Sequence, residues 1–72
     1  MTRTPGIAIT VNGARQEVPG PMTVDQLLDH LRTDRRMVAV ERNGQLVRRG
    51  EFATTRVVDG DQIEIVSFVG GG

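Results

Sequence analysis

Apolar side chains alternate with small or polar ones in the stretch IAITV, residues 7–11. This two-residue period is typical of a strand with one buried face. The pair Asn12-Gly13 comes next and favours a type I′ hairpin turn, because both turn positions need positive φ. We therefore expect a hairpin whose second strand covers residues 14–18. This strand ends at the Pro-Gly-Pro of residues 19–21, since proline cannot donate a hydrogen bond to a ladder.

The apolar period lengthens in the stretch TVDQLLDHLR, which predicts an amphipathic helix of about ten residues. Thr23 and Gln26 have the spacing of a capping box, in which each side chain bonds the backbone N–H of the other residue. Asp25 lies in the first turn, where the helix dipole favours a negative charge. One face of the helix is apolar and needs a sheet to cover; it carries Val24, Leu27, Leu28 and Leu31.

The second half of the chain repeats the pattern of strand and hairpin. Residues 37–41 and 45–47 flank a second Asn-Gly pair, Asn43-Gly44. Phe52 follows in a stretch without a clear period, and we expect it to anchor a short helical turn on the core. A turn with the sequence Asp-Gly-Asp then leads into a last strand over residues 62–68.

The elements follow one another as strand, strand, helix, strand, strand, helical turn and strand, which indicates a two-layer α+β domain. We expect the ubiquitin-like β-grasp fold, a mixed sheet of four to five strands with one main helix packed across it. The first and last strands would pair in parallel at the centre, and the other pairs would be antiparallel. The domain would cover residues 1–68, and residues 69–72 would form a flexible glycine tail.

Composition excludes several classes of function. The chain of 72 residues has no cysteine, which excludes a disulfide, a thiolate metal site and a cysteine nucleophile; its single histidine excludes a multi-histidine site. Nine basic residues balance nine acidic ones and only two residues are aromatic, so we expect no nucleic-acid partner. No apolar run could cross a membrane, and the first twenty residues lack the apolar core of a secretion signal. These patterns predict a cytoplasmic protein with no membrane partner.

The sequence closes on Ser67-Phe68-Val69 and three glycines. Glycine loses the most backbone entropy on folding and has no side chain to pack, so these glycines cannot stabilise a fold. Together with other motifs, this ending resembles the ThiS family of bacterial thiamine sulfur carriers. The motifs that carry the resemblance are Val11-Asn12-Gly13, residues 23–28, Asn43-Gly44, Val47-x-Arg49, Phe52-Ala53-Thr54, Asp59-Gly60-Asp61, Ile63-Glu64-Ile65-Val66 and the glycine run.

The resemblance implies that Gly72 bears the reactive group, its α-carboxylate. A ThiF-like partner enzyme would use ATP to adenylate this carboxylate, and a persulfide sulfur donor would then convert it to a thiocarboxylate. A ThiG-like thiazole synthase would receive the sulfur for thiazole formation. Gly70 and Gly71 lack Cβ atoms, so they would let the tail enter a narrow channel. The chain would then be a protein co-substrate and not an enzyme, with no catalytic residue, metal or bound cofactor of its own.

Alternation along the last strand places Ile63 and Ile65 on one face, and Val66 and Phe68 on the other. The helix can cover only one of these faces. Exposed apolar side chains beside the tail suit a partner surface. We therefore predict that Val66 and Phe68, with the neighbouring Val69, dock the partner enzymes.

The other polar residues have simpler interpretations. His30 is expected at the solvated rim of the helix, because no second ligand lies near it in sequence. Asp59 and Asp61 lack the further ligands of a calcium loop and are expected to form a turn. The arginine pairs at 35–36 and 48–49 fit a solvated face and a docking surface equally well.

Three alternatives stay open on this evidence. A MoaD-like carrier for molybdopterin synthesis, or a carrier for cysteine synthesis, would end in the same way. A β-grasp protein-binding module would make no chemical use of its tail. A ubiquitin-like modifier would be joined to lysines of other proteins through Gly72, since this chain contains no lysine.

Overall fold

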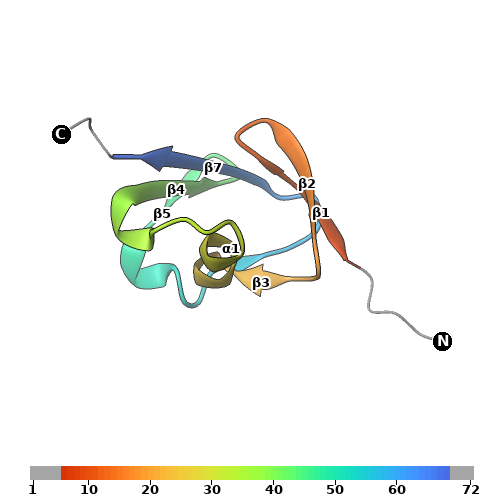
Figure 1. Ribbon diagram of the computed structural model, residues 1–72, viewed down its shortest axis with the longest axis horizontal. Helices are drawn as coiled ribbons and strands as arrows, with labels where there is room; N and C mark the ends of the chain where they lie inside the picture. Colours follow the sequence, from red (N-terminus) through yellow and green to blue (C-terminus); the bar gives the residue numbers. More distant parts are fainter. Residues whose placement is uncertain (1–5, 69–72) are drawn as a thin grey trace.

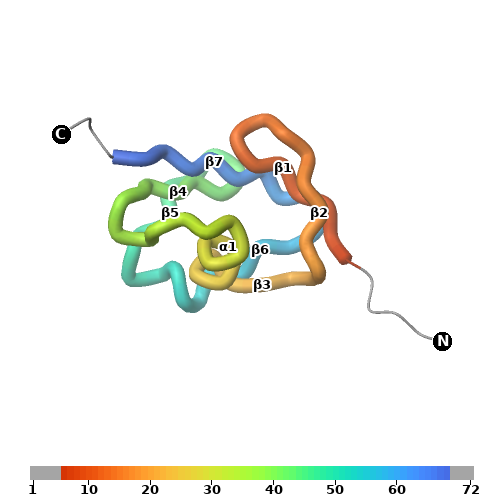
Figure 2. The backbone as a smooth tube through the Cα atoms, viewed as in Figure 1, coloured from red at the N-terminus to blue at the C-terminus, as the bar shows by residue number. Residues whose placement is uncertain are grey.

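The computed structural model describes residues 6–68. Over this range the chain forms β1 (Ile7–Val11), β2 (Ala14–Val18), β3 (Met22–Thr23), α1 (Val24–His30), the 3₁₀ turn η1 (Arg35–Met37), β4 (Val38–Arg42), β5 (Gln45–Val47), the 3₁₀ turn η2 (Arg49–Glu51), β6 (Arg56–Val57) and β7 (Gln62–Ser67). Five strands form one sheet in the order β2-β1-β7-β4-β5, and α1 lies across one of its faces (Figure 1). β3 and β6 form a small second sheet beside α1 (Figure 2).

Strands β1 and β7 pair in parallel at the centre of the main sheet. Thr10 lies opposite Gln62, and Val11 lies opposite Ile63. The neighbouring pairs β1–β2, β4–β7 and β4–β5 are antiparallel. This is the ubiquitin-like β-grasp arrangement that the order of elements predicted, with five strands in the mixed sheet and one helix across it.

Both Asn-Gly pairs form the predicted hairpin turns. Asn12 and Gly13 have φ of +50° and +84°, and Asn43 and Gly44 have φ of +52° and +83°. These left-handed values are those of a type I′ turn, whose twist matches that of the strands it joins. The two turns therefore set the register of β1 against β2 and of β4 against β5.

The core lies between α1 and the sheet face that the helix covers. Alternate residues of β1, β4 and β7 point into it, as the two-residue period predicted. Phe52, which directly follows η2, is buried there as predicted. The buried apolar side chains are Ile7, Ile9, Val11, Val18, Val24, Leu27, Leu28, Val38, Val40, Val47, Phe52, Val57 and Ile63.

Helix α1 begins at the predicted capping box. Thr23 Oγ1 accepts the Gln26 N–H at 3.1 Å, and Gln26 Oε1 accepts the Thr23 N–H at 2.9 Å. The apolar stripe faces the core: Val24, Leu27 and Leu28 are buried and Leu31 packs against them.

The helix has seven residues, so the prediction of about ten was wrong at its C-terminal end. Arg32 adopts φ of +56°, a left-handed conformation that cannot continue the helix. Its N–H donates to Asp29 O, and the Thr33 N–H donates to Leu28 O. This pair of bonds is a Schellman motif, with arginine at the position that usually holds glycine.

Two short strands, β3 and β6, were not predicted. They pair with Met22 opposite Val57 and Thr23 opposite Arg56. Strands of two residues are too short to show a period, so only the tertiary structure reveals them. β4 also starts one residue later than predicted, because Met37 belongs to η1.

Candidate docking surface around the last strand

Strand β7 is the middle strand of the sheet, held by β1 on one side and β4 on the other. The pairing with β4 runs from Arg42 opposite Ile63 to Val38 opposite Ser67. β7 cannot shift without breaking hydrogen bonds on both sides. It is therefore a rigid base for the residues that follow it.

The two Asn-Gly turns also hold β7 through their side chains. Asn12 Oδ1 accepts the Ile65 N–H at 2.7 Å, and Asn12 Nδ2 donates to Ile65 O at 3.1 Å. Asn43 Oδ1 accepts the Gln62 N–H at 2.9 Å, and the Asn43 N–H donates to Gln62 O at 2.8 Å. Asn12 thus extends the pairing of β1 with β7 past the end of β1.

Asp61 fixes the start of β7. It is the only buried polar residue within 6–68. Its Oδ2 accepts from Arg42 Nε and from the Val58 N–H, each at 2.8 Å, and its Oδ1 accepts from Asn43 Nδ2 at 3.0 Å. Burial alone raises the pKa of Asp61, but the hydrogen bonds from Arg42, Val58 and Asn43 outweigh this effect and lower the pKa below its ordinary value.

The turn at Asp59-Gly60-Asp61 forms as predicted. Asp59 Oδ1 accepts the Ala8 N–H at 2.8 Å, and Gly60 has φ of +87°. Both carboxylates are thus engaged by protein donors that join the turn to β1, to β4 and to the Asn-Gly turn after β4. Residues 6–68 contain no group of three or more histidine, aspartate or glutamate side chains that could hold a metal ion.

The sheet face opposite α1, here called the outer face, carries exposed apolar side chains. Ile63 on the inner face is 1% exposed, whereas Val66 and Phe68 are 59% and 56% exposed. The predicted division of β7 into two faces is therefore confirmed. Val66 lies opposite Ala39 on β4, and Leu46 on the next strand is 64% exposed. We call Ala39, Leu46, Val66 and Phe68 the outer patch.

The backbone just beyond β7 is held by η1. The Phe68 N–H donates to Met37 O at 2.7 Å, which continues the ladder one residue past the strand. Arg49 in turn donates from Nη2 to Arg36 O at 3.2 Å, so η2 supports η1. The end of β7 lies at the opposite end of the molecule from the start of β1 (Figure 1). Val69 and the predicted tail residues Gly70, Gly71 and Gly72 lie outside the described residues.

Two of the predicted arginines are neutralised within the chain. Arg35 Nη1 lies 3.0 Å from Asp25 Oδ2, and Arg36 Nη2 lies 3.0 Å from Asp34 Oδ2. The side-chain hydrogen bond with Arg36 lowers the pKa of Asp34 below its ordinary value. These pairs weaken the arginines as a positively charged docking surface.

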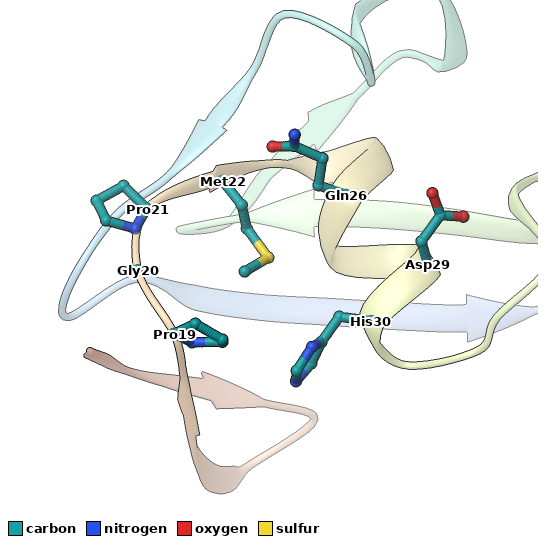
Figure 3. A pocket seen from close by; sticks show the side chains of 7 residues that line it. All are labelled: Pro19, Gly20, Pro21, Met22, Gln26, Asp29 and His30. Atoms are coloured by element: carbon teal, nitrogen blue, oxygen red, sulfur yellow. The ribbon is translucent and has the colours of Figure 1, made fainter. Parts of the chain in front are cut away.

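A separate hollow lies on the helix side of the molecule. Figure 3 shows its lining, where Met22 projects between Pro19 and His30. The hollow has a volume of about 620 Å³ and is completed by Gly20, Pro21, Gln26 and Asp29. His30 is exposed at its rim, as predicted. The polar side chains of its lining, Gln26, Asp29 and His30, are all exposed.

Sequence reasoning missed Leu46 as a surface residue. Leu46 and Val47 are adjacent and apolar in a strand of three residues, and the period does not decide which of them points inward. The register decides the orientation, because Val47 lies opposite buried Val40 and Leu46 lies opposite exposed Glu41.

No helix within 6–68 is long and apolar enough to span a membrane.

Comparison with known proteins identifies relatives of this chain. The crystal structure of the thiamine biosynthesis protein (ThiS) from Geobacter metallireducens is 39% identical, with a TM-score of 0.80, and the match covers 92% of this chain and 100% of that one. The sulfur carrier protein ThiS of Bacillus subtilis is 38% identical over 50 residues, which is 69% of this chain and 76% of that protein.

A longer protein is also similar. A thiazole synthase of Paramagnetospirillum magneticum is 45% identical over 64 residues, which is 89% of this chain and 20% of that protein. This chain therefore spans about a fifth of the length of that relative. The family model of the ThiS family matches residues 9–72. The chain therefore belongs to the ThiS family.

Proposed function

We propose that this chain is a sulfur carrier for thiamine biosynthesis. ThiS-family proteins are small carriers and not catalysts, so the chain acts as a protein co-substrate. The observation that carries the proposal is the family match, which extends over residues 9–72 and thus includes the entire glycine run. The names of the relatives from Geobacter metallireducens and Bacillus subtilis support the same role.

The proposed chemistry takes place at the α-carboxylate of Gly72. A carboxylate is a poor electrophile, so a ThiF-like enzyme first joins it to AMP from ATP and releases pyrophosphate. A persulfide sulfur then attacks the acyl carbon and displaces AMP. Reduction of the resulting acyl disulfide by a thiol leaves the thiocarboxylate. ATP and the sulfur donor are bound by the partners, and Gly70 and Gly71 give the tail access to their narrow sites.

The described residues would contribute docking and rigidity. A carrier must present its tail to more than one enzyme, which requires a surface that is exposed in the free protein. The outer patch meets this requirement, and its Phe68 directly precedes Val69 and the glycine run. Central placement of β7 and the bond from the Phe68 N–H to Met37 O fix Phe68 relative to the rest of the patch.

The sulfur acceptor we propose is a ThiG-like thiazole synthase. The support is the relative from Paramagnetospirillum magneticum, in which a stretch similar to this chain and a thiazole synthase belong to one polypeptide. Joining two proteins in one chain raises their effective concentration, which suits partners that act together. The cytoplasmic location stays a prediction.

The test is the intact mass of the chain after incubation with ATP, a ThiF-like enzyme, a persulfide source and a thiol reductant. We expect a mass gain equal to the replacement of one oxygen by sulfur, dependent on ATP. A matched variant that lacks Gly72 should show no gain. If the mass stays unchanged while the same enzyme modifies another ThiS protein in a parallel reaction, the proposed function is wrong.

A further inference from the structure

Two glutamates lie directly opposite each other within the outer face. In the register of β4 against β7, Glu41 faces Glu64. Cβ atoms of directly opposed residues in an antiparallel pair are about 4.5–5.5 Å apart. The next pair along the same two strands is Ala39 with Val66, and Glu41 also lies opposite Leu46 on β5. The two carboxylates are therefore flanked by the outer patch.

Neither glutamate is neutralised by the described part of the chain. Both are exposed, and no arginine among residues 6–68 lies within ion-pair distance of either carboxylate. The nearest arginine in sequence, Arg42, points to the other face and binds Asp61. Like charges directly opposed across strands are destabilising. The free protein tolerates them because water screens the pair.

A docked partner would remove this water. Charges that interact weakly in water interact strongly when they are covered, so a neutral surface would bury two repelling, unpaired carboxylates. A partner with a cation at this point would gain two attractive contacts instead. The guanidinium of arginine fits best, because its planar fork offers several donors to two carboxylates at once.

Resting on the proposed function, we propose that Glu41 and Glu64 together bind an arginine side chain of the thiazole synthase, presented within an apolar surface that covers the outer patch. The pair selects this partner by excluding neutral and acidic surfaces. It also gives the interaction a dependence on salt that an apolar patch alone would lack.

The experiment measures the dissociation constant of the complete chain with purified thiazole synthase from the same genome, by calorimetry at low and at moderate salt. The double variant Glu41→Gln/Glu64→Gln should bind about 10- to 100-fold more weakly at low salt, since truncation of charged interface pairs has effects of this size. Its binding should also depend less on salt. The matched control Glu17→Gln/Glu51→Gln removes the same two charges elsewhere and should stay within about threefold of the unaltered chain.

Each outcome has a distinct meaning. Thermal unfolding of the free double variant should show an unchanged or higher midpoint, which establishes that it folds; a higher midpoint would also show that the opposed charges repel. Equal affinity of the unaltered chain and the double variant would overturn the inference, as would an equal loss in the control. Failure of the unaltered chain itself to bind the synthase would instead contradict the proposed acceptor, and the inference with it.

Discussion

The two faces of the main sheet are built from alternate residues of the same strands, yet they differ in almost every property. Ile63 on β7 is buried in the core, whereas Val66 on the same strand and Phe68 just beyond it are more than half exposed on the outer face. Among the ion pairs of residues 6–68, only that of Arg42 with Asp61 has a buried carboxylate, and it lies at the start of β7. The unpaired glutamates Glu41 and Glu64 lie on the outer face beside the exposed patch.

This difference indicates that the inner face determines the stability of the fold and the outer face determines the binding of partners. The inner face follows the rules of a folded core: apolar residues are covered and the buried carboxylate is fully hydrogen-bonded. The outer face departs from this pattern, since apolar side chains are exposed and like charges lie opposite each other. Local violations of this kind are typical of binding sites. Substitutions on the inner face should therefore change unfolding, and substitutions on the outer face should change the interaction with partners.

The largest expected effect is on the inner face. Ile63→Ala should lower the free energy of unfolding by about 2–5 kcal/mol, because it leaves a cavity beneath the helix. A domain of this size has a total stability of only about 4–11 kcal/mol, so the loss should be plain in urea unfolding at neutral pH. The matched variant Val66→Ala on the outer face should change the value by less than about 0.5 kcal/mol. Similar losses in both variants would contradict the separation of the faces.

Asp61→Asn should lower the free energy of unfolding by about 2–3 kcal/mol at neutral pH, because it leaves Arg42 without its ion-pair partner. The pKa of Asp61 is lowered in the folded state, so its stabilising effect is present above the unfolded-state pKa and is lost as the pH falls through the folded-state pKa. The difference between the unaltered chain and the variant should therefore shrink in acid.

Urea unfolding at pH 7 and at pH values below 4 measures this dependence. Asp34→Asn is the control, because Arg36 lowers the pKa of Asp34 at an exposed site where solvent screening leaves little effect on stability. A constant gap between Asp61→Asn and the unaltered chain at all pH values would exclude the proposed role of the ionised carboxylate.

The double variant Val66→Ala/Phe68→Ala should impair transfer without impairing folding. Truncation of apolar contacts at the centre of an interface commonly weakens binding about tenfold or more. Because docking contacts hold the carrier equally in the ground state and the transition state, KM for the carrier should rise and kcat should stay unchanged. Kinetics of thiocarboxylate formation with the ThiF-like enzyme measure both constants.

Val58→Ala is the matched control for this variant, since Val58 is an exposed valine in the loop at the other end of β7. It should leave KM unchanged. If the outer variant and Val58→Ala behave alike, the outer patch is not the docking surface for that enzyme.

The smallest expected effect concerns the end of the helix. Arg32→Gly should raise the free energy of unfolding by up to about 1 kcal/mol, because glycine adopts the left-handed conformation of this position without strain. The midpoint of thermal unfolding should rise by a few degrees, within the roughly 4–8 °C that 1 kcal/mol produces in a small domain. Arg32→Ala, which removes the charge but keeps the Cβ atom, should show no gain; an equal gain would assign the effect to charge.

Much of the fold could be predicted from the sequence, because short-range signals fix it. Apolar residues alternate with small or polar ones along β1, both Asn-Gly pairs favour tight turns, and the capping box of Thr23 with Gln26 marks the start of the helix. The helix end was misjudged, because Arg32 stands where the usual signal is glycine. β3 and β6 were missed, because a strand of two residues carries no period.

The docking surface could be predicted only in part. Alternation along β7 correctly separated Val66 and Phe68 from Ile63. The opposition of Glu41 and Glu64 depends on the register between two strands that lie far apart in sequence, and a shift of one residue would abolish it. The two hydrogen bonds between the Asn12 side chain and the Ile65 backbone likewise depend on the parallel pairing of β1 with β7. The local sequence therefore predicts only the role of Asn12 in the turn.

The most direct test of the outer patch is a map of the surface that a partner covers. Amide NMR signals of the isotope-labelled chain would be followed during titration with the thiazole synthase. We expect shifts or broadening at Leu46, Val66 and Phe68, with the signals of Gln26 and His30 at the hollow on the helix side unchanged. Changes confined to the hollow, with the outer patch unaffected, would contradict this prediction.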